Sequence, residues 1–121
     1  MRPKNNFSAR QNLGYAWAGF KDAFAKEKAF RIWLAAFFPL QAVAFALPIP
    51  LAHRIVLSLS LFATPLAEIV NTMIERAVDL VTKEHNELAK QAKDLGSTLV
   101  VACLLFTATA WALTLFHAFT R

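Results

Sequence analysis

Five polar side chains that could do acid–base or metal chemistry recur along one stretch of the sequence: Glu68, Asn71, Thr72, Glu75 and Asp79. On a helix, Glu68 and Glu75 would lie roughly 20° apart around the axis and roughly 10.5 Å apart along it. The other three fall on or beside the same stripe, and the remaining positions are mostly apolar. Such a stripe offers a general base and oxygen ligands for Mg²⁺, two parts that phosphoryl transfer needs.

The stretch follows an apolar run, residues 55–66, in which Pro65 is the single turn signal. We therefore expect one helix through both, with a membrane span at about 52–73 and a cytoplasmic extension to about 83. Glu68 would then lie just inside the interface and Glu75 in water. Ionisable residues at the depth of Glu68 are costly and usually functional.

The composition is that of a membrane protein. Of 121 residues, 57% are hydrophobic and 17% charged, whereas soluble domains have about 45–50% apolar and about 25% charged residues. The fold class expected is all-α integral membrane, with an N-terminal amphipathic interfacial helix plus three transmembrane helices in a single domain, 1–121. Three helices enclose little interior, so we expect oligomerisation with the site completed between subunits.

The other elements follow from periodicity. Apolar and aromatic residues at helical spacing predict an interfacial helix at about 7–27. A first span is expected at about 29–47, where Pro39 should kink the helix, Trp33 should act as an interfacial anchor and Gln41 should form a helix–helix hydrogen bond. A charged linker, 82–94, should lead to a third span at about 98–119.

Basic residues are concentrated at two places. Seven of the thirteen Lys and Arg residues lie at or before residue 31, and four lie between 76 and 93. By the positive-inside rule, the N-terminus and the 76–94 segment are expected to be cytoplasmic. Because these basic residues lie beside apolar spans, their charge favours anionic lipid headgroups and nucleotide phosphates as partners. We expect no nucleic-acid partner.

The run 68–79, EIVNTMIERAVD, resembles the signature of the prokaryotic diacylglycerol kinases. Segments 14–17, 27–31 and 93–97 resemble that family at the expected distances, so that the resemblance covers nearly the whole chain. It implies a homotrimeric kinase of the bacterial inner membrane. Such enzymes transfer the γ-phosphate of MgATP to diacylglycerol, and the phosphatidic acid formed feeds phospholipid metabolism.

The resemblance also implies roles for residues. Glu68 is expected to be the general base on the lipid hydroxyl, and Glu27 and Glu75 to hold Mg²⁺ with the ATP phosphates. The residues implied at the ATP site are Arg10, Tyr15, Glu27, Asn71, Glu75, Glu84, His85, Asn86, Lys93 and Asp94. Those implied at the lipid site are Gly14, Tyr15, Ala16, Trp17, Phe30, Arg31, Glu68 and Ser97. Met73 departs from the family, which usually has a small residue there.

Other interpretations stay open at this point. By position alone, Glu27 is typical of a surface acid that pairs with Lys28 or Arg31. Undecaprenol kinase, of the same fold, is an alternative activity. A small cation-coupled transporter with Glu68 as coupling acid is a third, but it should carry that acid at the midplane and show inverted repeats.

Overall fold

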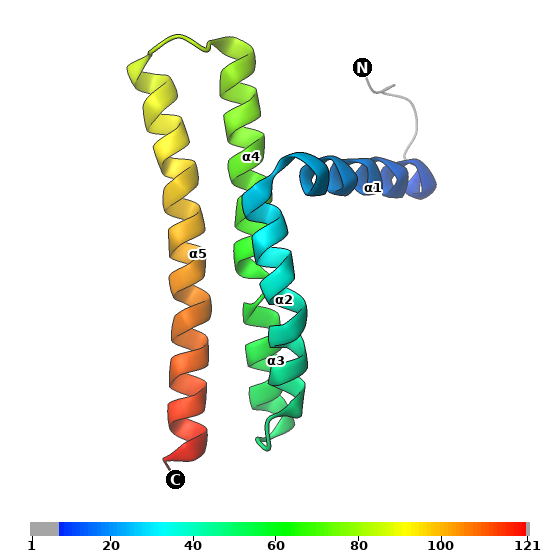
Figure 1. Cartoon of the computed structure of the whole chain (residues 1–121), viewed down its shortest axis with the longest axis vertical. Coiled ribbons are helices and arrows are strands. Elements are labelled where there is room, and N and C mark those ends of the chain that lie inside the picture. Colours follow the sequence, from blue (N-terminus) through cyan, green and yellow to red (C-terminus); the bar gives the residue numbers. More distant parts are fainter. Residues whose placement is uncertain (1–7, 121) are drawn as a thin grey trace.

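The computed structural model describes residues 8–120, whose regular elements are all helices. They are α1 (Ala9–Lys26), α2 (Lys28–Ala46), α3 (Leu51–Ser60), α4 (Ala63–Val81) and α5 (Glu87–Phe119). In Figure 1, α2, the pair α3 and α4, and α5 run side by side, and α1 projects sideways from the start of α2. The expected start of the interfacial helix, position 7, lies outside the described residues.

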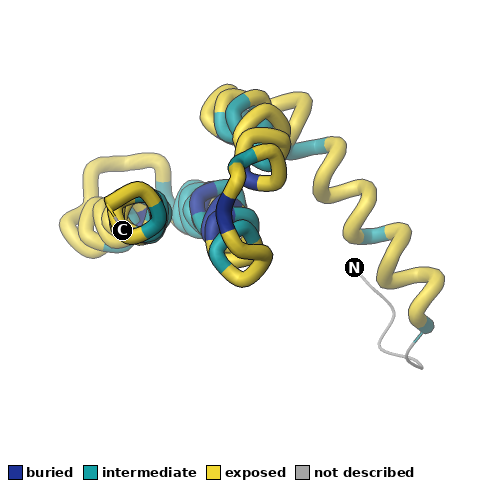
Figure 2. The backbone as a smooth tube through the Cα atoms, turned by 90° about the horizontal axis from the view of Figure 1, so that it is seen from below, coloured by how far each residue is buried: buried dark blue, intermediate teal, exposed yellow. Residues whose placement is uncertain are grey.

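Three segments are long and apolar enough to cross a membrane. They are Lys28–Ala46, Leu51–Val81 and Glu87–Phe119. The expected fold class, an all-α membrane protein with an amphipathic arm and three spanning helices, is therefore confirmed. Figure 2 shows that the buried residues gather around α3 and α4, whereas much of α5 is exposed.

The second span runs from Leu51 to Val81, close to the expected bounds, but its helix is interrupted at one point and divides into α3 and α4. The break falls at Leu61 and Phe62, whose N–H groups each bond a carbonyl three residues back at 3.2 Å. Pro65 explains the break, because it has no N–H to donate to the carbonyl of Leu61. Both residues keep right-handed helical dihedrals, and α4 continues from the end of α3 (Figure 1).

Polar side chains connect the spans at mid-depth. The Gln41 Nε2 atom of α2 donates to the Ser58 carbonyl of α3 at 3.0 Å, and the Ser58 hydroxyl donates back to Gln41. The helix–helix bond expected of Gln41 is thus confirmed. The Thr107 hydroxyl of α5 donates to the Ser60 carbonyl at 2.7 Å. Such bonds stabilise helix pairs where no water competes.

The charged segment expected to be a linker is largely helical. The turn between α4 and α5 covers only residues 82–86, and α5 begins at Glu87 because the Asn86 side chain accepts from the Ala89 N–H at 3.1 Å as an N-cap. The linker was predicted too long because α5 continues beyond its membrane span. Its 33 residues form a helix roughly 50 Å long, which exceeds a hydrocarbon core of about 30 Å. The expected span, 98–119, lies within it.

α4 and α5 approach closely at Gly96. A Cβ atom built there would lie 2.2 Å from Asn71 Oδ1 and 3.5 Å from Ile74 Cδ1. Gly96 is buried inside α5, so the absence of a side chain lets Asn71 of α4 lie against the α5 backbone. This contact sets the distance between the two helices beside the acidic stripe.

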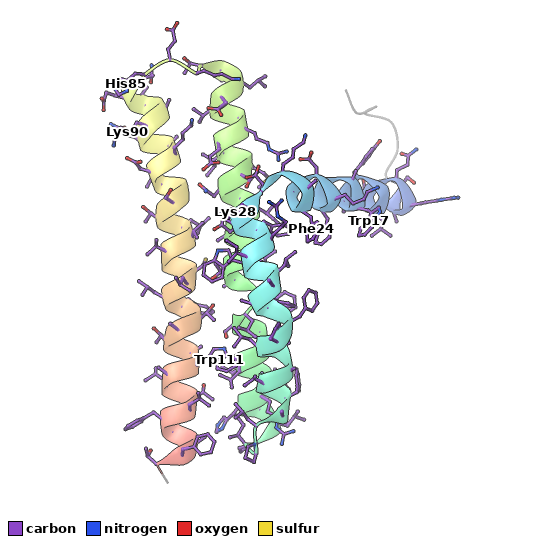
Figure 3. All side chains as sticks on the ribbon, viewed as in Figure 1. Trp17, Phe24, Lys28, His85, Lys90 and Trp111 are labelled. Atoms are coloured by element: carbon purple, nitrogen blue, oxygen red, sulfur yellow. The ribbon has the colours of Figure 1, made fainter. Side chains whose placement is uncertain are left out.

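The arm α1 is fixed to the bundle at its C-terminal end. Glu27 has an extended conformation between α1 and α2, and Arg31 Nη1 donates to the Phe24 and Ala25 carbonyls at 2.7 and 3.0 Å. These carbonyls belong to the last turn of α1, where intrahelical partners are missing. Trp17 and Phe24 lie on the side of α1 toward which α2 runs (Figure 3). The arm therefore presents aromatic side chains toward the expected membrane.

A charge network joins α1 to α4. The Arg76 guanidinium of α4 bonds Asp22, and its Nη2 atom lies 3.0 Å from Glu27 Oε1. Lys26 also pairs with Asp22, at 2.8 Å. The hydrogen bonds from Lys26 and then Arg76 hold the pKa of Asp22 below its ordinary value. Isolated exposed pairs contribute little, but here one guanidinium holds two acids that flank the end of α1.

Replacing Gly96 tests the close approach of the helices. In Gly96→Ala, the Asn71 side chain must move and lose its contact with Glu75, so we expect a loss of about 1–3 kcal/mol in stability. Gly19→Ala is the matched control, because a Cβ there meets nothing within 4 Å, and alanine favours helix by about 1 kcal/mol. Thermal unfolding in detergent measures both; equal midpoints would contradict the close approach.

The charge network predicts that docking of α1 depends on pH. The folded-state pKa of Asp22 is lowered, so its stabilising contribution is present above the ordinary carboxyl range and is lost as pH falls through the lowered value. A nitroxide on Ala18→Cys, in a Cys103→Ser background, should stay immobile at neutral pH and become mobile only as pH falls below the ordinary carboxyl value of 3.8, toward the lowered value. With Arg76→Gln it should be mobile at neutral pH, as electron paramagnetic resonance would show. An immobile label there would mean that apolar contacts alone hold α1.

Candidate active site

Glu68 is a buried carboxylate on the face of α4 that meets α2. Its residue is 8% exposed, and its neighbours Thr64 and Ala67 are buried with it. The Trp33 Nε1 atom of α2 donates to Glu68 Oε1 at 3.1 Å. Burying a carboxylate is expensive unless hydrogen bonds compensate, so this contact holds the acid in an otherwise apolar surrounding.

Asn71 and Glu75 lie further along the same stripe. The Asn71 Nδ2 atom donates to Glu75 Oε1 at 3.2 Å, whereas its Oδ1 atom is buried with no hydrogen-bond partner. Both residues are half-buried. This unpartnered amide oxygen and the neighbouring Glu75 carboxylate form a small group of oxygen atoms. Part of their capacity to accept a hydrogen bond or bind a cation is unused in the described chain.

The outer end of the stripe is paired with one lysine of α5, and a second ion pair lies within α5. Lys93 Nζ lies 2.7 Å from Asp79 Oδ1, and Lys90 Nζ lies 2.7 Å from Asp94 Oδ2. These four side chains are all substantially exposed. Charge thus accumulates on α4 and α5 beyond Glu75, in the direction away from the apolar spans.

An open hollow lies beneath the 82–86 turn. It has a volume of about 400 Å³, and Figure 3 shows His85 and Lys90 at this end of α5. Five of the residues expected at the ATP site line it: Glu84, His85, Asn86, Lys93 and Asp94. Two others, Arg10 and Tyr15, lie on α1, which projects away from α5 (Figure 1), and they do not line this hollow.

A second, apolar groove of about 460 Å³ separates α1 from α4. Its lining is Ala16, Gly19, Phe20, Asp22, Ala23, Ile69, Thr72, Met73 and Arg76. Glu68 itself does not line the groove, but its helical neighbours Ile69 and Thr72 do. Met73, the departure from the family pattern, forms part of its wall.

The residues expected at the lipid site fall into separate places. Gly14, Tyr15, Ala16 and Trp17 all lie on α1, and of these Ala16 lines the groove. Phe30 is 3% exposed and packs edge-on against Phe20, with ring centroids 5.7 Å apart. Arg31 caps α1. Ser97 lies on α5 beside a shallow hollow that it shares with Asp94, Thr98 and Val101. The described residues of one chain therefore do not bring all of the expected lipid-site residues together.

The expected metal pair is not in direct contact either. Glu27 is bonded by Arg76, not by Lys28 or Arg31 as its position alone suggested, and Glu75 is bonded by Asn71. Among the described residues, three or more His, Cys, Asp or Glu side chains do not cluster as a metal site. The oxygen donors at Glu75 and Asn71 suit Mg²⁺, which usually takes one or two carboxylates and completes its shell with water and substrate phosphates.

Three contributors were missed by sequence reasoning. Trp33, expected as an interfacial anchor, bonds Glu68. Arg76 and Asp22 connect α4 to the arm, although they are 54 positions apart. Nothing in the local pattern marks these residues, because each acts through a contact between elements distant in sequence.

Comparison with known proteins identifies the family of the chain. The family model for prokaryotic diacylglycerol kinase matches residues 14–115. The Escherichia coli K12 diacylglycerol kinase is 32% identical over 106 residues, 88% of this chain and 87% of that protein. The Pseudomonas aeruginosa diacylglycerol kinase is 35% identical over 99 residues, 82% of this chain and 80% of that protein. With its three spanning helices and buried acid, the chain belongs to the prokaryotic diacylglycerol kinase family of membrane enzymes.

Proposed function

We propose that this chain transfers the γ-phosphate of ATP to diacylglycerol at the cytoplasmic face of a bacterial inner membrane, and so supplies phosphatidic acid to phospholipid metabolism. The observation that carries this proposal is the buried Glu68 carboxylate of α4, a helix that also lines the apolar groove and carries an acid paired with α5 at its outer end. Relatives named diacylglycerol kinase, 32–35% identical, support the choice of lipid.

The groove between α1 and α4 suits the apolar part of the lipid. Its walls are mostly apolar, and Asp22 and Arg76 contribute the charged side chains of its lining. A lipid lying in it brings its free hydroxyl near Glu68. The carboxylate takes the hydroxyl proton as the lipid oxygen attacks the γ-phosphorus, the bond from that phosphorus to its bridging oxygen breaks, and ADP leaves.

The nucleotide would approach from the aqueous end. Lys90, Lys93 and the 82–86 turn surround the open hollow there, and lysine ammonium groups are common phosphate ligands. Glu68 follows the start of α3 by 17 residues, roughly 26 Å along the helix axis, which places it near the far edge of a hydrocarbon core of about 30 Å. The proposed topology therefore has the lipid hydroxyl and the phosphates meeting at the cytoplasmic interface.

Glu75, with Glu27, is the proposed holder of Mg²⁺. The unpartnered Asn71 Oδ1 beside Glu75 fits an ion that prefers oxygen ligands. Mg²⁺ bound with ATP would neutralise charge on the phosphates. In the described chain Glu27 must leave Arg76 to take this role, and Arg76 keeps Asp22 as a second partner.

We also propose a homotrimer. Among the buried residues of the described chain, α5 contributes only Gly96, and the residues expected at the lipid site are divided between α1 and α5. A neighbouring copy could bring the face of one chain that carries Ser97 to the arm of another. That arrangement would enclose Glu68 more fully than three helices can.

The activity is tested with purified protein, MgATP and mixed micelles that contain either diacylglycerol or undecaprenol. We expect phosphorylated diacylglycerol, and we expect Glu68→Gln to lower kcat about 10²–10⁴-fold because the amide cannot accept the hydroxyl proton. Glu87→Gln, on the exposed first turn of α5, is the matched control. Product from undecaprenol alone would refute the lipid assignment, and a Glu68→Gln enzyme with normal kcat would refute the base.

The metal assignment is tested by varying the Mg²⁺ concentration. Glu75→Gln and Glu27→Gln should each raise the Mg²⁺ concentration for half-maximal activity and lower kcat, because each removes a charged oxygen ligand. The measurement is initial rate against Mg²⁺ at saturating ATP and lipid. A variant with unchanged Mg²⁺ dependence would show that its residue is a surface acid.

A further inference from the structure

Trp33 and Glu68 form a hydrogen bond that the expected role of neither residue predicts. The indole Nε1–H of Trp33, on the first turns of α2, donates to Glu68 Oε1 at 3.1 Å. Building on the proposed kinase function, we propose that Trp33 is a positioning residue that orients the Glu68 carboxylate for the lipid hydroxyl. Trp33 itself touches neither lipid nor nucleotide in this proposal.

The contact occupies one carboxylate oxygen and leaves the other available. Within residues 8–120, the donor that hydrogen-bonds Glu68 is Trp33. The second oxygen, Oε2, carries no such bond, yet it is not among the buried atoms without partners. It is therefore the carboxylate oxygen that the described chain leaves unbonded and not fully enclosed. A lipid hydroxyl can approach it without displacing an existing bond.

The chemistry of the indole suits this task. An indole N–H is a donor only and stays neutral, so it cannot take the proton that Glu68 must accept. A lysine or arginine in this place would pair its charge with the base, and a hydroxyl group could accept as well as donate. Trp33 therefore fixes the geometry of the base and does not compete for the substrate proton.

The surroundings of Trp33 hold the indole in place. With Phe37, Leu61 and Thr64 it lines a narrow cavity of about 90 Å³ between α2, the α3–α4 break and α5. Trp33 is half-buried there, and tryptophan prefers the level of the membrane interface. The bond therefore sets both the rotamer of Glu68 and its depth relative to α2.

Matched variants separate the N–H from the ring. Trp33→Phe keeps an aromatic ring and removes the donor, whereas Trp33→Gln loses the ring but carries an N–H the same number of bonds from Cβ. Trp111→Phe is the control, because the Trp111 Nε1 atom is buried without a partner. It lies in the other half of the bundle (Figure 3).

We expect Trp33→Phe to lower kcat about 10- to 100-fold, the effect of losing one hydrogen bond to a charged group, with the KM for ATP unchanged. Trp33→Gln should recover most of that loss, and Trp111→Phe should match the wild type. The proposal is overturned if Trp33→Phe stays within twofold of Trp111→Phe, if it changes only KM, or if the Gln and Phe variants lose activity equally.

A spectroscopic measurement tests the contact without any kinase assay. In ¹⁵N-labelled protein in micelles, the Trp33 indole N–H resonance should shift upfield in Glu68→Ala, and the Trp111 resonance should not move. An unmoved Trp33 signal overturns the proposed contact even if variants fold poorly. If the signal moves but no lipid is phosphorylated, the contact stands, and it is the proposed function that fails.

Discussion

The cost of holding a carboxylate at the edge of an apolar bundle governs this structure. Removing an ion from water costs several kcal/mol even after relaxation, and Glu68 is 8% exposed. One hydrogen bond from Trp33 partly offsets that cost. The bond requires α2 to run beside α4 with Trp33 level with Glu68, and so the register of the two helices depends on it.

The acidic side chains that the helical repeat places in one line on α4 differ in how deeply they are buried. Glu68 is buried, Glu75 is half-buried and bonded by Asn71, and Asp79 is paired with Lys93 of α5. Seven residues of helix separate the first two acids, roughly 10.5 Å. In the proposed function, that distance would bring one carboxylate to the lipid side of the interface and the other to its aqueous side.

The sequence predicted what depends on local pattern. Composition and helical periodicity are sufficient for three spans, an amphipathic arm and the polar stripe, because each is a property of one segment. The break at Leu61–Phe62 was missed because Pro65 could equally have been absorbed inside a helix, as Pro39 is inside α2. The early start of α5 was missed because charged residues are compatible with both a loop and an exposed helix.

The contacts between helices could not be predicted from the sequence, for a different reason. The bond from Trp33 to Glu68 and the network of Arg76 with Asp22 and Glu27 depend on how helices are placed against one another. A single sequence contains no periodicity that pairs position 33 with 68 or 22 with 76. The resemblance did direct attention to Glu27, but it gave no indication that an arginine of α4 bonds that carboxylate.

That arginine would compete with the proposed cation for Glu27. A carboxylate cannot hold a guanidinium and a divalent cation with the same oxygen, so cation binding at Glu27 and its bond to Arg76 oppose one another. Arg76 has Asp22 as a second acidic partner, and Asp22 has Lys26. Glu27 can therefore be released without leaving Arg76 unpaired, and α1 stays attached to α4 through Asp22. The network thus separates the attachment of the arm from the charge of Glu27, which the proposed Mg²⁺ site needs to be free.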